Sequence, residues 1–178
     1  RNIFVGKSAR IIRALLTDRD RIWSQAELVK RTASSSGLVS RIVQYLINQG
    51  YAEKNSAREF RLGDHSALLD SWVESDNIAR RTTIYRYAGY LGAPLDLAKG
   101  VQDWAQQESV SIAFTQWLAA WVRHPYTEPP LTSAYVSRLP DDATLESLAL
   151  RPVSEGGKLW LYLPDDPGLL AETQSRGD

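Results

Sequence analysis

Three stretches of the first fifty residues place apolar side chains three or four positions apart, which is the spacing of an amphipathic helix. We expect helices over residues 8–16, with Ser8 as the N-terminal cap, over about 24–31 and over about 36–49. Between and after them, β-branched and aromatic residues near polar turns predict three short strands, at residues 22–23, 51–53 and 59–62.

The ends of these predicted helices carry recognisable capping signals. Ser24 and Glu27 have the spacing of a capping box, in which each side chain bonds a backbone N–H of the other residue. The run of small hydroxyl residues at 32–36 is expected to end the second helix and cap the third. Gly50 stands where a left-handed residue commonly ends a helix. The order helix, strand, helix, turn, helix, hairpin predicts a winged helix-turn-helix over roughly residues 7–62.

The remaining pattern predicts one more helix and then a change of domain. Asp64 or Ser66 is expected to cap a helix containing Leu68 and Trp72, and the polar run at 75–77 marks a boundary near residue 78. The chain is therefore divided into residues 1–78, a DNA-binding domain, and residues 79–178, a small mixed α/β domain. The predicted fold class of the whole chain is α+β.

The second domain alternates strands and helices and then closes with two strands. A helix over 144–150 capped by Asp142, and a hairpin of Val153 with 159–163 across Gly156 and Gly157, are expected near its end. The other predicted elements are strands at 82–87, 109–114 and 133–136, helices at 95–107 and 116–122, and a turn at 89–94.

A net charge of zero conceals two oppositely charged halves. Residues 1–62 contain twelve Lys and Arg against five Asp and Glu, a net charge of +7, so the rest of the chain carries −7. A basic module joined to an acidic one is typical of a nucleic-acid-binding domain attached to a domain with another task.

A DNA-reading surface follows from the third helix, where Val39, Val43 and Leu46 form the stripe that packs inward. Small hydroxyl residues at its start allow close approach to the major groove, and Arg41 is the first choice for a base contact, since its fork matches guanine. Ser24 and Gln25 are expected to offer backbone N–H groups to a phosphate, and Lys54 and Arg58 to reach DNA from the wing. The full predicted set is Ser24, Gln25, Ser35, Ser36, Ser40, Arg41, Gln44, Tyr45, Lys54 and Arg58. The alternative is a winged helix that contacts only proteins.

Catalytic and metal-binding signals are lacking in the sequence. There is no cysteine, hence no thiol nucleophile, disulfide or zinc–thiolate site, and a reducing cytoplasm is the expected location. His65 and His124, far apart, are interpreted as surface or helix-end residues. No metal or other cofactor is expected. No apolar run approaches a membrane span, so a membrane is not among the expected partners. The sequence also has no methionine, and the chain is interpreted as a fragment or as a chain from which some residues are omitted.

Three aromatic residues of the second domain, Trp104, Trp117 and Trp121, recur at helical spacing. Core packing is the expected role, and a partner-binding surface is the alternative. The acid pair Asp141 and Asp142 follows a proline and precedes an apolar helix, which is better explained by capping than by acid–base chemistry.

Blocks from both halves together resemble the AbiEi-type antitoxins and regulators of type IV toxin–antitoxin systems. In the first half the blocks are residues 8–16, 23–28, 37–41 and 68–72. In the second half they are residues 112–115, 119–121, 150–153 and 165–168. The first set is common to many regulators, whereas the second is more distinctive.

The resemblance implies a winged-helix antitoxin that represses its own operon and opposes a nucleotidyltransferase-like toxin. The second domain would then be a degenerate nucleotidyltransferase core. The turn at 115–117 lacks the glycines of active members, and the strand at 132–136 lacks their Asp-x-Asp pair, so no enzyme activity is expected. Double-stranded DNA, a cognate toxin and a second copy of the chain are the expected partners. The alternatives are a nucleotidyltransferase with a DNA-tethering domain and a protein-interaction adaptor.

Overall fold

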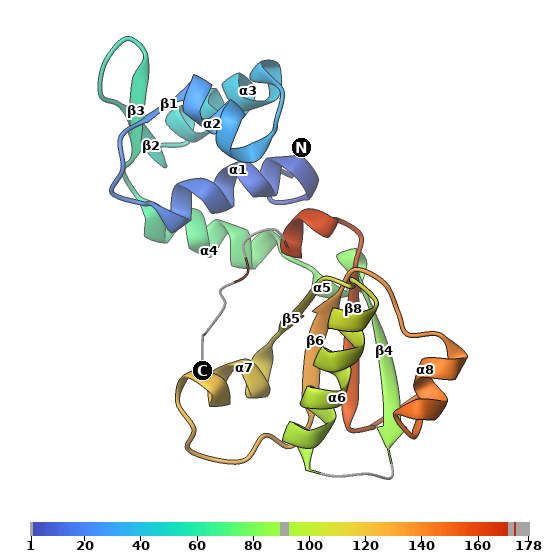
Figure 1. Ribbon diagram of the computed structural model, residues 1–178. Helices are drawn as coiled ribbons and strands as arrows, with labels where there is room; N and C mark the ends of the chain where they lie inside the picture. Colours follow the sequence, from blue (N-terminus) through green and yellow to red (C-terminus); the bar gives the residue numbers. More distant parts are fainter. Residues whose placement is uncertain (1, 90–92, 171–172, 174–178) are drawn as a thin grey trace. The chain divides into compact units, whose positions relative to one another are not determined.

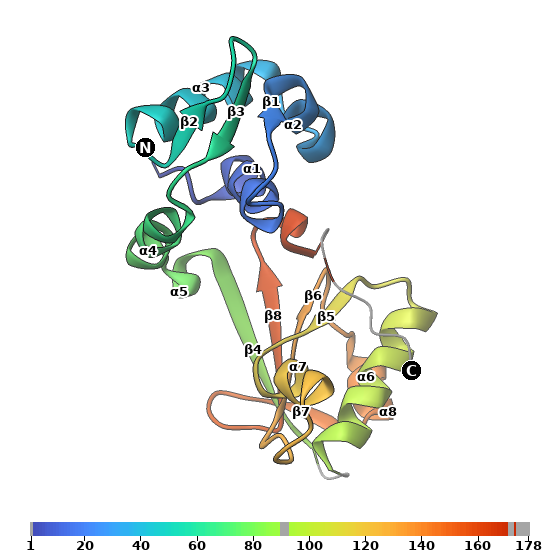
Figure 2. The same cartoon turned by 90° about the vertical axis from the view of Figure 1, so that its left-hand side faces the viewer.

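The computed structural model describes residues 2–89, 93–170 and 173, and its fold class is α+β, as the sequence predicts (Figures 1 and 2). The chain divides into two compact units, Arg1–Asn77 (unit 1) and Ile78–Asp178 (unit 2). The division lies one residue before the boundary expected from the polar run at 75–77. Within the described part of the chain, no helix has the length and apolar character needed to cross a membrane.

Unit 1 contains four helices and a small sheet, in the order predicted from the sequence. Its elements are α1 (Gly6–Thr17), β1 (Trp23–Ser24), α2 (Gln25–Thr32), α3 (Ser36–Asn48), β2 (Ala52–Lys54), β3 (Glu59–Leu62) and α4 (His65–Ser75). The sheet is antiparallel with strand order β1-β3-β2, so β3 lies in the centre and β2 at an edge. The β2–β3 hairpin projects beyond the helices, as both views show (Figures 1 and 2).

The predicted apolar stripes form a single core in unit 1. Val39, Val43 and Leu46 of α3 are buried together with side chains of α1, β1, α2 and β3. At the other end of the core, Phe4 stacks on Trp72 of α4 with ring centroids 5.3 Å apart. The hydrophobic spacing therefore fixes which face of each helix points inward.

Capping signals predicted the starts of most of these helices correctly. Ser24 and Glu27 form the expected capping box, and the Asp64 carboxylate accepts the backbone N–H of Ala67 at 2.8 Å to cap α4. Gly50 has a φ of 78°, the left-handed conformation predicted after α3. The prediction for Ser8 was wrong, because α1 begins at Gly6 and places Ser8 inside the helix.

Unit 2 has the predicted alternation of strands and helices around a five-stranded sheet. Its elements are α5 (Ile78–Arg81), β4 (Thr82–Gly89), α6 (Pro94–Gln107), β5 (Ile112–Phe114), α7 (Gln116–Arg123), β6 (Thr132–Val136), α8 (Asp142–Ser147), β7 (Leu150–Val153), β8 (Leu159–Pro164) and a 3-10 turn, η1 (Pro167–Leu170). The middle of the turn predicted at 89–94 lies outside the described residues.

The strand order of unit 2 is β5-β6-β8-β4-β7, which overturns the predicted terminal hairpin. Strands β7 and β8 do not pair with each other, because β4 lies between them and is antiparallel to both. Their connection instead crosses the end of β4, where the Lys158 N–H donates to the Tyr87 carbonyl at 2.9 Å. Gly157 (φ 85°) passes so close that a Cβ would stand 2.6 Å from the Tyr87 carbonyl oxygen, so only glycine fits there.

Helices cover the two faces of this sheet unequally. Apolar side chains of α6 and α8, including Leu97, Val101 and Leu145, share one buried cluster with Leu159 and Leu161 of β8. Alternate residues of β8 point to opposite faces, so Tyr162, which bonds Gln116 at the start of α7, lies on the other face. Helices α6 and α8 therefore build the core, while α7 lies on the opposite face of the sheet.

Candidate nucleic-acid interface

Helix α3 presents the polar face predicted from the sequence. Its inward stripe is buried and includes Ile42 as well as the three predicted residues. The side chains expected on the other face are all exposed, and they are Ser36, Ser40, Arg41, Gln44 and Tyr45. Thus one face of α3 is held by the core and the other is free for contact with a partner.

The start of α3 is fixed by a hydroxyl cap. The side chain of Ser35, the N-cap residue, accepts the backbone N–H of Leu38 at 3.3 Å. This bond satisfies one of the donors that a helix leaves open at its first turn. Ser36 and Ser40 then follow on the exposed side, where small side chains leave the helix backbone accessible.

Two longer side chains of α3 are oriented by bonds within the helix. The Arg41 Nε donates to the Gly37 carbonyl at 3.3 Å, and the Gln44 amide donates to the Asn48 Oδ1 at 2.8 Å. Both bonds join residues four positions apart, and so they hold each side chain along the helix surface. The Arg41 fork therefore lies on the exposed face, in the position predicted for a base contact.

The start of α2 corrects part of the predicted site. The Glu27 carboxylate accepts the Ser24 backbone N–H and hydroxyl, each at 2.8 Å, and the Arg21 guanidinium, also at 2.8 Å. Hydrogen bonds from Ser24, supported by Arg21, lower the pKa of Glu27 to about 2. The Ser24 N–H is thus occupied by a carboxylate, and its predicted role as a phosphate donor was wrong. Gln25, the next residue, is exposed.

The β2–β3 hairpin carries the predicted cations Lys54 and Arg58, both exposed. Its loop is shaped by Glu59, whose backbone carbonyl accepts the N–H groups of Asn55 at 2.9 Å and Ser56 at 3.2 Å. The carboxylate of Glu59 accepts the side chains of the same two residues, at 3.3 and 3.1 Å. Arg58 therefore lies on a loop whose conformation is held by Glu59, and Lys54 is the last residue of β2, where that loop begins.

Acids and bases of this surface differ in how they are paired. Glu53 forms a cross-strand ion pair with Arg61 at 2.6 Å, and Glu27 and Glu59 are held as described above. Among the residues that the structure describes, by contrast, no ion pair involves Arg41, Lys54 or Arg58. All three of these uncompensated cations were predicted to meet a phosphate or a base.

A groove of about 320 Å³ brings part of the predicted set together, namely Ser24, Gln25, Lys54 and Arg58. The exposed residues of α3 do not line it, so the predicted set is divided between the groove and the helix face. Sequence analysis missed the apolar members of the groove, among them Ile47 and Ala57. The sequence gives little sign of these residues, because the groove forms only when the hairpin lies against α2 and α3.

Unit 2 places uncharged side chains where the degenerate nucleotidyltransferase core was expected. In β6, Ser133 is buried and its hydroxyl donates to the Thr115 carbonyl at 2.9 Å. Tyr135 packs on Tyr162 with ring centroids 5.1 Å apart, and Gln116 donates to the Tyr162 hydroxyl at 2.9 Å. Gln116 has a φ of 53°, a left-handed conformation that glycine adopts more readily. The strand has no carboxylate to hold a metal ion.

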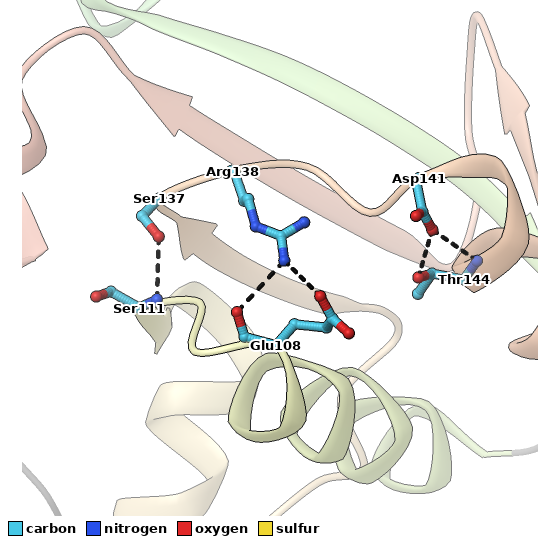
Figure 3. A network of polar contacts seen from close by, with 6 residues as sticks. All are labelled: Glu108, Ser111, Ser137, Arg138, Asp141 and Thr144. Carbon is cyan, nitrogen blue, oxygen red and sulfur yellow. Dashed lines mark hydrogen bonds and ion pairs between the residues drawn. The ribbon is translucent and has the colours of Figure 1, made fainter.

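The acid pair near α8 has a structural role, shown in Figure 3. Asp141 is the N-cap, and its carboxylate accepts the Thr144 N–H at 2.9 Å and the Thr144 hydroxyl at 2.6 Å. These bonds, with a smaller contribution from Arg138, lower the pKa of Asp141. The capping prediction was right in kind but named Asp142, which is the first helical residue. The helix also ends earlier than predicted, since Leu150 belongs to β7.

The same close-up shows how α6 is tied to the end of β6 (Figure 3). Arg138 donates to the Glu108 carboxylate at 2.8 Å and to its carbonyl at 3.3 Å. Ser137 accepts the Ser111 N–H at 3.0 Å, and its own N–H bonds the Ser111 carbonyl. The network links two loops, the one between α6 and β5 and the one between β6 and α8, and it pairs the charged groups of Glu108 and Arg138 with each other.

The remaining candidates for chemistry are helix-end or surface residues. His65 is the first residue of α4 and His124 the C-cap of α7, as predicted. In the described part of the chain, no three acidic or histidine side chains cluster as a metal site would require. Trp104 is buried as expected, whereas Trp117 is 62% exposed, so the prediction of core packing for Trp117 was wrong.

Comparison with known proteins gives no relative: no protein-family model and no curated protein matches the sequence.

Proposed function

We propose that unit 1 is a winged-helix domain that binds double-stranded DNA, with α3 in the major groove and the β2–β3 hairpin as the wing. The observation that carries this proposal is the imbalance of charge on the exposed surface. Arg41, Lys54 and Arg58 form no ion pairs within the described residues, while the nearby acids Glu27, Glu53 and Glu59 are held by neighbouring groups. Uncompensated bases beside a protruding helix face are what a DNA backbone attracts.

In this proposal the protein is a DNA-binding transcriptional regulator of antitoxin type that represses its own operon. The antitoxin assignment rests on the resemblance of the sequence blocks to AbiEi-type regulators. Unit 2 then serves as a non-catalytic domain, because Ser133 and Tyr135 occupy the strand that would carry metal-binding acids. Its exposed aromatic side chains Trp117 and Tyr126 suit contact with a protein partner such as a nucleotidyltransferase-like toxin.

A salt-dependent titration tests the DNA-binding proposal. The full chain is titrated into labelled duplex DNA from its own upstream region and into random duplex of the same length, at several salt concentrations. Each phosphate contact contributes roughly −0.9 to the slope of log affinity against log salt, so affinity should fall steeply. Lys54→Gln and Arg58→Gln should each lower the slope by about one. Lys30→Gln, an exposed base of α2 that does not line the groove, is the matched control. No binding at low salt would end the proposal.

The antitoxin assignment needs a separate experiment. Expression of a reporter placed behind the upstream region should be repressed by the full chain. The Arg41→Ala chain should no longer repress it. If a gene for a nucleotidyltransferase-like protein adjoins the operon, cells that express that gene should stop growing. Co-expression of the present protein should restore their growth. Repression without relief would leave a regulator and remove the antitoxin.

A further inference from the structure

The groove introduced above lies between three elements of unit 1, and we call it the hairpin groove. It is lined by the start of α2, by Val43 and Ile47 of α3, and by the hairpin from Lys54 to Phe60. Its volume of about 320 Å³ is at the lower end of the range for small-molecule sites. A ring or fused ring pair with one short substituent is small enough to enter it.

The inner lining of the hairpin groove is apolar. Val43 and Phe60 are almost completely buried, and Ile47 is half-buried beside them. Ala26 and Ala57 also line the groove, and their small side chains take up little of its space. A wall of this kind gains from burial of an apolar ligand surface and offers nothing to a bare hydrated ion.

The rim of the hairpin groove is positive. Lys54 and Arg58 stand there with no ion pair among the described residues, and Gln25 adds an exposed amide. The carboxylate in the lining, Glu59, already accepts hydrogen bonds from Asn55 and Ser56 of the loop. Two cations against one engaged carboxylate favour a ligand with a single negative charge.

We propose that the hairpin groove binds a small amphipathic monoanion, an aromatic carboxylate, whose ring packs on Val43, Ile47 and Phe60 while its carboxylate meets Lys54 and Arg58. The regulatory consequence rests on the proposed function. Because the same two cations would contact the DNA backbone, a bound carboxylate competes with duplex DNA. The site thus couples a metabolite of this chemical class to release of the operator.

Binding is tested on the full chain by NMR, with backbone amide resonances as the readout. The probes are 2-naphthoate, the neutral analogue 2-naphthamide and inorganic phosphate. Saturable shifts at Gln25, Ile47 and Ala57 are expected for 2-naphthoate, with at least about tenfold weaker binding of the amide. Phosphate should leave Ile47 unshifted. Absence of saturation by 2-naphthoate up to about 10 mM, or equal shifts from phosphate, would overturn the proposal.

Variants separate the wall from the rim. Lys54→Gln with Arg58→Gln should weaken 2-naphthoate binding about tenfold, and Ile47→Trp should block it by filling the groove. Lys30→Gln, the matched control outside the lining, should bind as the unaltered chain does. Unchanged affinity in the Ile47→Trp chain, with its amide spectrum still that of a folded protein, would place the ligand elsewhere and overturn the proposal.

Competition with DNA distinguishes failure of this site from failure of the proposed function. At a naphthoate concentration equal to its own Kd, the apparent Kd for duplex DNA should double. If naphthoate binds but duplex DNA does not, the winged-helix function is wrong and the ligand site stands. If DNA binds and naphthoate leaves its affinity unchanged, the site is overturned while the function stands.

Discussion

Helix α3 of unit 1 and helix α7 of unit 2 each have one buried and one exposed side, and the two exposed sides differ in chemistry. The outer face of α3 consists of hydroxyl, amide, guanidinium and phenol groups, and four residues hold its inner face in the core. Helix α7 buries only Leu118 and exposes Trp117 and Val122. One helix face suits a charged, hydrated surface, and the other an apolar one.

The comparison shows that the way a helix is anchored does not reveal what it binds. Both helices pack through aliphatic side chains, as hydrophobic spacing requires. The difference lies in residues that contribute little to folding, and partner preference is therefore found on the solvent side. We call the buried side of such a helix its anchoring face and the exposed side its contacting face, and substitutions on the two faces should have separable effects.

The largest effect is expected in α7, where the neighbouring residues Trp117 and Leu118 differ sharply in burial. Leu118→Ala removes a side chain that is 1% exposed and should lower the free energy of unfolding by about 2 to 5 kcal/mol. Trp117→Ala should change it by less than about 0.5 kcal/mol. Urea unfolding followed by circular dichroism measures both. Equal losses of stability would mean that α7 has no distinct contacting face.

The next effect concerns the contacting face of α3. Arg41→Ala should cost about 1 to 3 kcal/mol of binding free energy on the specific DNA site and little on random duplex, because a base contact is lost. Lys54→Ala should weaken binding to both DNAs alike. Fluorescence anisotropy measures the affinity of each variant for the specific and for the random duplex. If Arg41→Ala weakens both equally, Arg41 contacts the backbone and the assignment of base reading to α3 fails.

A smaller effect is expected at the anchoring end of α2. Ser24→Ala removes the capping hydroxyl and should lower the free energy of unfolding by about 0.5 to 2 kcal/mol. Since the folded-state pKa of Glu27, about 2, lies below its ordinary value of 4.5, its contribution to stability is complete above pH 4.5. It is lost as pH falls toward 2. Urea unfolding from pH 7 to pH 3 should show that the free energy of unfolding falls less for the Glu27→Ala chain than for the unaltered chain. An equal fall in both chains would contradict the capping role.

The last prediction is that unit 2 binds no nucleotide. Calorimetry with each of the four nucleoside triphosphates and magnesium should show no saturable heat, because β6 has no carboxylate and Asp141 caps α8. Asp141→Ala should lower the free energy of unfolding through the lost cap and leave the calorimetry unchanged. Micromolar binding that disappears in the Asp141→Ala/Asp142→Ala chain would instead restore the nucleotidyltransferase hypothesis.

Features set by neighbours three or four residues apart were predictable from the sequence. The capping box at Ser24, the stripe through Val39 and Leu46, and the left-handed Gly50 all depend on local spacing. The cap of α1 was missed because its N-cap, Val5, makes no side-chain cap bond that a motif would reveal. Local chemistry thus predicts the elements and most of their ends.

Features set by distant residues were not predictable in the same way. Two glycines between apolar runs suggested that β7 pairs with β8. In the structure both strands pair with β4 instead, and Leu159 and Leu161 of β8 lie opposite residues of β4. The exposure of Trp117 was missed because helical spacing alone does not tell which aromatic residues a short helix can bury. Likewise, four candidate contact residues share a groove only once the hairpin has folded back.

The position of β4 between β7 and β8 has a consequence for synthesis on the ribosome. Unit 1 completes its sheet as soon as Leu62 has emerged, because its pairs lie close in sequence. Strand β4 is made early in unit 2, but its partners are β7 and β8, so its backbone N–H and C=O groups stay unpaired until residues 150–164 appear. A nascent chain therefore carries a folded first domain ahead of an open, aromatic-rich strand, the state that chaperones shield from aggregation.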